Sequence, residues 1–333
     1  MEYHPKKLNQ QSGYQISFLH QLPSNQPSLY GGKATNLARL HQNGIPIPRG
    51  FVIPIKGFIA FISECKHLES YKKLQLEQNN FEELLHSAET FRKIASEYDI
   101  PKPVEKEISR GFSSLRTHHE PSSTGFAIRS SATAEDSEHF SFAGQADSFL
   151  CVHDLPSIIK AVKMTWLSLY SPRALLYLQA KGIKIDQMQM AVIVQEMIIG
   201  DISGVMFTAN VATNDSEQLM IDSTWGIGES IVSGKVIPDS FLLQKTPLKI
   251  LKRQLGEKAL LCTPYPRDHP QGTMLIETPK KQRKIFSLTD SEIISLARLG
   301  MQIEEHMGHP QDIEWTLQKD QFVILQTRPI TTI

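Results

Sequence analysis

Short apolar runs separated by turn signals alternate along this chain with longer segments whose apolar residues recur at helical spacing. The runs at 51–53 and 126–128 are short and bounded by turn residues, which favours buried strands. Residues 30–40 pass from a glycine turn into three- and four-residue apolar spacing, which predicts a helix. The same criteria predict mainly helix at 56–120 and 155–182, a helix at 289–307 that begins with Thr289 or Asp290 as its N-cap, and further strands at 190–194, 204–207, 218–221 and 241–243.

The balance of helix and strand changes part-way along the chain. Predicted helices dominate up to about residue 185, and short strands dominate after about residue 195. We therefore predict an α+β fold of two lobes, a helix-rich first lobe at 28–190 and a strand-rich second lobe at 191–333. Residues 1–27 are polar and rich in Gln, Ser and Pro, so we expect a loosely held segment there.

The composition narrows the range of partners. Lys and Arg number 35 and Asp and Glu number 35, so a formal charge near zero argues against bulk attraction to nucleic acid or anionic membrane. Cys65, Cys151 and Cys262 are widely spaced, which suits a reducing compartment better than a disulfide framework. No stretch approaches the ~20 apolar residues of a membrane span, and the first residues lack an apolar signal core. We expect a cytoplasmic protein that binds neither nucleic acid nor membrane.

The last alternation of apolar and polar residues predicts a β-hairpin with its turn at Asp320. Because successive strand side chains point to opposite faces, this turn places Glu314 opposite Gln326. The same register places Asp312 opposite Arg328. The other face is predicted to meet the core and carries Ile313, Trp315, Leu317, Val323 and Leu325.

Two carboxylates, an amide oxygen and a guanidinium thus share one face of this hairpin. Hard divalent cations prefer oxygen ligands, and a planar guanidinium binds phosphate through paired hydrogen bonds. The face therefore predicts a site for a divalent cation and the phosphates it bridges. The alternative is a surface hairpin held by a salt bridge.

Two upstream motifs have the chemistry of phosphate binding. Gly31-Gly32-Lys33 opens a helix, so free backbone N–H groups, the helix dipole and a mobile ammonium lie together. It is not the Walker pattern, and a turn with a solvated lysine is the alternative. Arg129 ends a strand and precedes three hydroxyl-bearing residues, which suits polyphosphate or an ordinary Ser-rich loop. Downstream, Gly144 would permit close approach of the backbone to a ligand.

A third motif suits an adenine ring. An apolar strand is followed by Gln195, Glu196 and Met197, near the point where predicted helices give way to predicted strands. A strand leaving a sheet offers a backbone donor and acceptor to the adenine edge, and a Met side chain adapts to its face. The alternative is a plain strand end. The glycines at 226–234 lack the spacing of a dinucleotide fingerprint, so we reject a Rossmann assignment.

Taken in order, these segments resemble the nucleotide-binding domain of the phosphoenolpyruvate synthase, pyruvate phosphate dikinase and rifampicin phosphotransferase family. The resemblance covers about residues 28–331 and rests on the motifs GGKATNL, PIPRGFVI, IRSSATAED, SFAGQ, VQEM, GVMFT, WGIGESIVSG, DIEW and QTRPI. It implies an ATP-grasp fold whose two lobes clamp ATP with Mg²⁺.

The resemblance also implies roles for individual residues. It matches Lys33, Arg129 and Arg328 to phosphate-binding and catalytic positions, and Gly144 to a phosphate-covering loop. It matches the strand at 195–197 to adenine contacts. The metal and catalytic cluster corresponds to Glu314 and Gln326, with Asp312 in support.

The family's phosphohistidine and acceptor domains have no counterpart in this sequence. We therefore expect an ATP-dependent phosphotransferase whose acceptor is a histidine on a partner chain or a small molecule. A one-step ATP-grasp kinase or ligase that forms ADP is the first alternative. A non-catalytic nucleotide-binding regulator is the second.

Overall fold

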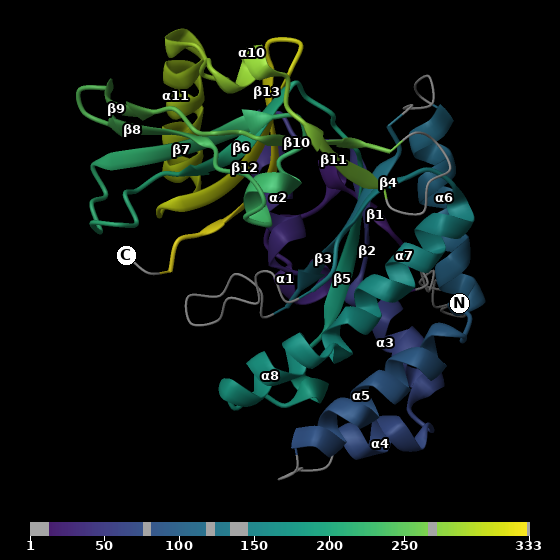
Figure 1. Ribbon diagram of the computed structural model, residues 1–333. Coiled ribbons are helices and arrows are strands. Elements are labelled where there is room, and N and C mark those ends of the chain that lie inside the picture. Colours follow the sequence, from purple (N-terminus) through teal and green to yellow (C-terminus); the bar gives the residue numbers. More distant parts are fainter. Residues whose placement is uncertain (1–12, 76–80, 118–123, 134–145, 266–271, 332–333) are drawn as a thin grey trace, which may run out of the picture.

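The computed structural model of the protein describes residues 13–75, 81–117, 124–133, 146–265 and 272–331. These residues form two large antiparallel sheets, a small hairpin and a set of helices (Figure 1). Helix and strand are both abundant, which confirms the predicted α+β class. None of the helices in these ranges combines the length and apolar character needed to cross a lipid bilayer.

The first sheet has five strands in the order β1-β2-β5-β3-β4, and all its neighbours are antiparallel. Val192 and Val194 of the central β5 pack into the core beneath the helices, whereas Ala191 and Ile193 pack into the core shared with the second sheet. This alternation follows from the two-residue period of a strand, and it buries both faces of the sheet. The strands are β1 (Ser17–Phe18), β2 (Gly50–Ile53), β3 (Phe126–Ala132), β4 (Phe149–Val152) and β5 (Met190–Glu196).

Helices α3 to α8 contribute side chains to one core on the first sheet. Trp166 is fully buried there and stacks on Phe61 with 5.6 Å between ring centroids. Figure 1 shows α4, α5 and α8 at the end of the molecule far from the second sheet. The helices of this half are η1 (Leu19–Gln21), α1 (Pro27–Tyr30), α2 (Gly32–Gln42), α3 (Ile55–Cys65), α4 (Glu69–Gln75), α5 (Phe81–Ser96), α6 (Lys102–Thr117), α7 (Leu155–Leu167), η2 (Ser168–Tyr170), α8 (Pro172–Ala180) and η3 (Ile185–Gln187).

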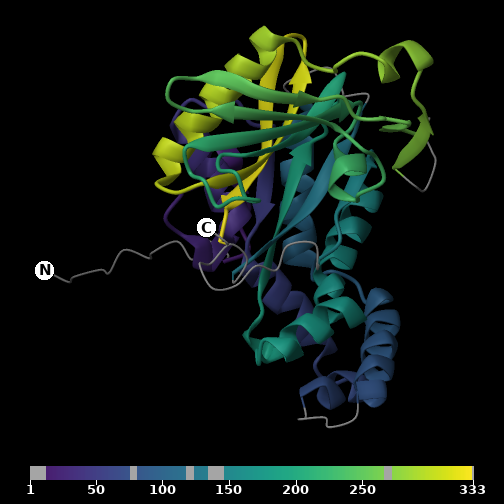
Figure 2. The ribbon, with the colours of Figure 1, turned by 60° about the vertical axis from the view of Figure 1, so that its left-hand side comes forward.

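The second sheet has six antiparallel strands in the order β13-β12-β6-β7-β8-β9, and helix α11 packs against it (Figure 2). Thr289 caps α11 through a capping box with Glu292, as one of the two predicted N-caps. The elements are β6 (Ile202–Phe207), β7 (Gln218–Trp225), α9 (Glu229–Val232), β8 (Asp239–Gln244), β9 (Lys249–Gln254), β10 (Leu260–Pro264), β11 (Thr273–Glu277), α10 (Lys280–Arg283), α11 (Asp290–Met307), β12 (Gln311–Gln318) and β13 (Gln321–Pro329).

Two boundaries differ from those expected. Strand β5 lies in the middle of the first sheet, so sheet membership changes after Glu196 rather than between residues 190 and 191. The segment expected to be loose is packed from Ile16 onwards, because Leu19 and Leu22 are each only 1% exposed. Apolar residues spaced among Gln and Ser are enough to anchor this segment in the core.

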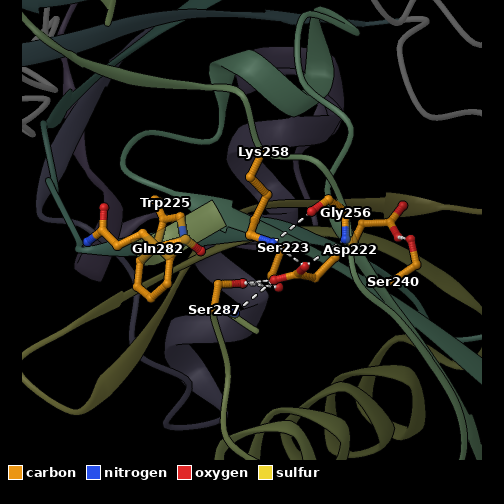
Figure 3. A network of polar contacts seen from close by, with 9 residues as sticks. Asp222, Ser223, Trp225, Ser240, Gly256, Lys258, Gln282 and Ser287 are labelled. Carbon is orange, nitrogen blue, oxygen red and sulfur yellow. Dashed lines mark hydrogen bonds and ion pairs between the residues drawn. The ribbon is translucent and has the colours of Figure 1, made fainter. Parts of the chain in front are cut away.

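A buried ion pair fixes the segment after β9 to the second sheet. Lys258 and Asp239 are both fully buried, with 2.5 Å between the Lys258 ammonium and Asp239 Oδ1. The ammonium also donates to the Gly256 carbonyl, and the Ser287 N–H and hydroxyl both donate to Asp239 Oδ2 at 2.8 Å (Figure 3). The two buried charges are paired with each other, so the network has a structural role. Removing one partner would leave an uncompensated buried charge.

Candidate functional site

The C-terminal hairpin has the predicted pairing on its polar face. Strands β12 and β13 are adjacent and antiparallel, with Glu314 opposite Gln326 and Asp312 opposite Arg328. Lys319 and Asp320 form the turn with φ of 48° and 63°, the positive values that a tight hairpin turn requires. Arg328 Nε donates to Asp312 Oδ2 at 2.7 Å.

The apolar face of this hairpin differs from the prediction beyond Glu314. The register shifts between Glu314 and Trp315, and an irregular pairing of this kind is a β-bulge. As a result Ile324, rather than Val323 or Leu325, is fully buried in the core. Leu325 lines a cavity on the polar side instead. A one-residue shift moves the following side chains to the other face of a strand, so the prediction for Val323 and Leu325 was wrong.

Arg129 reaches this hairpin from the first sheet. Its Nη1 donates to Glu314 Oε2 at 2.8 Å and to Gln326 Oε1 at 3.2 Å. Arg129 lies on β3 beside Ile193 of β5, on the face of the sheet opposite the core of helices α3 to α8. A strong charge-assisted contact therefore joins two residues that are 185 positions apart in the sequence.

The two carboxylates of this face differ in their pKa. Burial raises the pKa of Asp312, and this effect outweighs the attraction of Arg328. Burial also acts to raise the pKa of Glu314, but the nearby charges of Arg129, Lys33 and Arg328 together lower it. Glu314 is thus held as a carboxylate among cations, the charge state that a metal ligand needs.

The glycine turn that precedes α2 positions Lys33, whose charge helps to lower the pKa of Glu314. Lys33 is the second residue of α2 and is 9% exposed. Gly31 has a φ of 75°, and a Cβ atom there would lie 2.1 Å from the Ser131 carbonyl oxygen. Ser131 accepts a hydrogen bond from the Ala34 N–H and donates one to the Tyr30 carbonyl. Only glycine allows the helix to begin this close to β3.

The strand end expected to meet adenine is largely engaged with protein. The Met197 N–H donates to the Gly125 carbonyl at 3.0 Å, and the Met197 carbonyl accepts from the Thr124 hydroxyl at 2.9 Å. The Glu196 N–H donates to the Arg49 carbonyl at 2.8 Å. The two N–H groups therefore cannot donate to a nucleotide without breaking a bond, whereas the Met197 carbonyl keeps a second lone pair. Gln195, Glu196 and Met197 do line a cavity.

This cavity brings five of the ten predicted site residues together, whereas Lys33, Asp312, Gln326 and Arg328 are not among its lining residues. It has a volume of about 140 Å³ and contains Arg129, Glu314 and residues 195–197. No site role was predicted for its other lining residues, which include Ser203, Gly204, Ile227, Gly228, Glu229 and Leu325. The segment 226–229 belongs to the family motif WGIGESIVSG and lacks the spacing of a dinucleotide fingerprint, and no site role was predicted for its residues. Gly144 lies outside the described residues.

The donors in this site suit a phosphate-bound divalent cation. Arg129 Nε and Gln195 Oε1 are buried without a hydrogen-bond partner among the described residues, so both have capacity for a polar ligand. Within the described ranges no three His, Cys, Asp or Glu side chains cluster as a metal site. A cation held by Glu314 and Gln326 would therefore need further oxygen ligands, which phosphates supply.

Comparison with known proteins agrees with this chemistry. Residues 27–333 match the family model described as the AMP/ATP-binding domain of pyruvate phosphate dikinase. The chain belongs to this family. The predicted relationship is thereby confirmed over nearly the whole sequence.

Three curated relatives show the extent of the match. A probable phosphoenolpyruvate synthase of Methanocaldococcus jannaschii is 32% identical over 320 residues, which are 96% of this chain and 27% of that protein. Rifampicin phosphotransferase of Bacillus subtilis is 36% identical over 95% of this chain and 36% of its own length. Phosphoenolpyruvate synthase of Pyrococcus furiosus is 33% identical over 96% of this chain and 44% of its own length. The chain spans less than half the length of each of these relatives.

Proposed function

We propose that this dikinase-family domain binds ATP with Mg²⁺ between its two sheets and supplies the nucleotide site of an ATP-dependent phosphotransferase. The observation that carries the proposal is the contact of Arg129 with Glu314 and Gln326. This contact joins the guanidinium of Arg129, on one sheet, to the side-chain oxygens of Glu314 and Gln326, on the other sheet. A nucleotide between the sheets would then be bound by both, as in an ATP-grasp fold of two lobes.

The roles of the residues follow from their charges. Glu314 and Gln326, with Asp312 behind them, would hold Mg²⁺. Lys33, Arg129 and Arg328 would neutralise phosphate charge as it redistributes during transfer. Phosphoryl transfer is catalysed mainly by such positioning and electrostatic stabilisation. Arg129 would move from its carboxylate partner to phosphate when the cation binds Glu314.

The acceptor separates two routes. In the first route, a histidine on a partner chain or domain receives the phosphoryl group. This route is supported by the relatives named phosphoenolpyruvate synthase and rifampicin phosphotransferase, which are longer than this chain. In the second, a small molecule receives the phosphoryl group in one step and ADP is formed. A non-catalytic regulator is disfavoured because Lys33, Arg129 and Glu314 are all present.

Product analysis distinguishes these routes. The purified chain is incubated with ATP and Mg²⁺, with and without a candidate histidine-domain protein, and the nucleotides are separated by chromatography. We expect AMP only when the partner is present. Partner-independent ADP formation would support the one-step route instead. Absence of ATP binding in calorimetry would refute the nucleotide site itself.

A further inference from the structure

Helix α2 carries Lys33 but lacks a side-chain cap at its own first position. The first N–H groups of a helix have no partner inside the helix, and a Ser, Thr, Asp or Asn side chain at the N-cap normally accepts from one of them. The N-cap of α2 is Gly31, from which no side-chain hydrogen bond can come. An acceptor for the first turn of α2 must therefore come from elsewhere in the fold.

Ser131 of β3 supplies that acceptor. Its Oγ accepts a hydrogen bond at 3.1 Å from the N–H of Ala34, the third residue of α2. This is the N–H that an N-cap serine usually binds. The same hydroxyl donates to the Tyr30 carbonyl at 2.8 Å. Ser131 is fully buried and lies 97 residues from Ala34 in the sequence, so a distant strand caps this helix.

A hydrogen bond on the other side fixes α2 to the second sheet. The Asn36 Nδ2 donates to the Thr327 carbonyl of β13 at 3.3 Å. Thr327 lies between Gln326 and Arg328, which are both predicted site residues. Lys33 precedes Asn36 by three residues, so the two side chains lie on the same face of α2. Helix α2 is thus bonded to both sheets, with Lys33 in its first turn.

The strand that caps α2 also carries Arg129. Because strand side chains alternate, Arg129 and Ser131 point to the same face of β3. Arg129 donates to Glu314, and the charge of Lys33 helps to lower the pKa of the same carboxyl group. Strand β3 therefore controls the position of two cations relative to Glu314. It carries Arg129 directly, and it caps the helix that carries Lys33.

We propose that Ser131 is a positioning residue for phosphoryl transfer, because its cap on α2 holds Lys33 in place relative to Arg129. Ser131 does not touch the nucleotide itself, since it is fully buried and bonds to Ala34 and Tyr30. This inference rests on the proposed function, in which Lys33 binds phosphate, and adds a residue that acts through Lys33.

The cap matters because a lysine has a long, flexible stem. Its ammonium is a point charge that can move on four carbons, so its position depends on how firmly its backbone is held. Loss of the Ser131 hydroxyl would leave the first turn of α2 free to fray. Electrostatic stabilisation in phosphoryl transfer relies on charges that are already in place.

A double-mutant cycle of Mg-ATP binding tests the proposal on the full chain. Ser131→Ala should weaken binding about fivefold, the usual cost of a lost N-cap. Lys33→Met removes the charge of Lys33 and keeps the length of its side chain. In the Lys33→Met background, Ser131→Ala should weaken binding less than about twofold, because the group through which it acts is gone. Calorimetry measures all four proteins.

Ser130→Ala is the matched control. Ser130 is also a buried serine of β3, but it lies opposite Val192 and faces the core beneath the helices. We expect Ser130→Ala to leave the affinity for Mg-ATP unchanged, and urea unfolding reports the stability of each variant. Ser131→Cys keeps the side-chain volume but forms only weak hydrogen bonds, and it replaces Ser131→Ala if that variant does not fold.

A second measurement needs no nucleotide. The ¹³C signal of the Glu314 carboxyl group, followed as the pH changes, gives the pKa of Glu314. Because the charge of Lys33 helps to lower this pKa, Lys33→Met and Ser131→Ala should both raise it, whereas Ser130→Ala should not. If the wild-type chain does not bind ATP, the proposed function fails, and this titration still decides whether Ser131 positions Lys33.

Two results would overturn the proposal. The first is an equal loss of affinity from Ser131→Ala with and without the charge of Lys33, which would show that Ser131 supports the fold in general. The second is a folded Ser131 variant that leaves either the affinity for Mg-ATP or the pKa of Glu314 unchanged.

Discussion

Two ion pairs on the same hairpin differ in what holds them. Arg328 and Asp312 face each other across β12 and β13, only 16 residues apart, so any hairpin with this register would bring them together. Arg129 and Glu314 are 185 residues apart and meet only when both sheets are folded and packed. Arg328 and Asp312 are the local pair, because they belong to one hairpin. Arg129 and Glu314 are the long-range pair, because they meet only in the complete fold.

The surroundings of the two carboxylates differ accordingly. Asp312 has one cation, and burial dominates its pKa. Glu314 has Arg129, Lys33 and Arg328 nearby, and these charges overcome burial. The long-range pair therefore lies at the centre of the positive charge, and the local pair lies beside it. Under the proposed function, we therefore expect Glu314 rather than Asp312 to be the principal metal ligand.

The largest effect should come from breaking the long-range pair. We expect Arg129→Ala and Glu314→Ala each to abolish ATP turnover while unfolding remains cooperative, because each removes a group proposed to contact phosphate or metal. Turnover is measured by nucleotide chromatography and cooperativity by urea unfolding. Arg253→Ala, at the far edge strand β9, is the control and should keep full turnover. Wild-type turnover in both site variants would show that the site is assigned wrongly.

Neighbouring residues of β13 test the consequence of the bulge. Ile324→Ala should lower the free energy of unfolding by about 2–5 kcal/mol, because it creates a cavity in the core. Leu325→Ala should cost much less stability but weaken Mg-ATP binding, because Leu325 lines the cavity proposed to hold the nucleotide. Urea unfolding and calorimetry measure the two effects. The reverse assignment of effects would support the regular register instead of the bulge.

The local pair should matter less for binding than the long-range pair. Arg328 is 31% exposed in its side chain against 14% for Arg129, so water screens it more. We expect Arg328→Ala to weaken Mg-ATP binding about tenfold, against a loss of more than about thirtyfold for Arg129→Ala. Calorimetry on both variants gives the ratio. Equal losses would remove the distinction between the two pairs.

The smallest expected effect is on how the free energy of unfolding depends on pH. The contributions of Glu314 and Asp312 to this dependence should have opposite signs. The pKa of Glu314 is lowered in the fold, so its stabilisation is complete above the ordinary value of about 4.3 and is lost as the pH falls through the native value. The stability difference between wild type and Glu314→Gln should therefore shrink below about pH 4.

Asp312 should behave in the opposite way. Its pKa is raised in the fold, so the native state binds a proton more tightly than the unfolded chain. Wild type should lose stability relative to Asp312→Asn as the pH rises from about 3.9 through the native value. Urea unfolding at small pH steps measures both differences. Slopes of the same sign would contradict the assignment of the two environments.

The sequence predicted individual helices and turns better than it predicted which strands lie next to each other in a sheet. The α11 cap at Thr289 and the hairpin turn at Asp320 depend on nearby residues, and both were readable from local pattern. Strand β5 was expected to begin the second lobe, but its partners β2 and β3 come from earlier in the chain. Glu229 had no local pattern that marked it as part of a cavity wall.

By itself, the sequence determined the family and the polar face of the C-terminal hairpin. The period of strand side chains predicts the pairs Asp312–Arg328 and Glu314–Gln326, and the fold forms them by combining a two-residue turn with a β-bulge between Glu314 and Trp315. Only the tertiary structure decided that Arg129 meets Glu314, that Leu325 leaves the core, and that Glu229 lines the cavity proposed to hold the nucleotide. The physical reason is range: hairpin register depends on residues close in the chain, whereas these three features depend on how two sheets pack against each other.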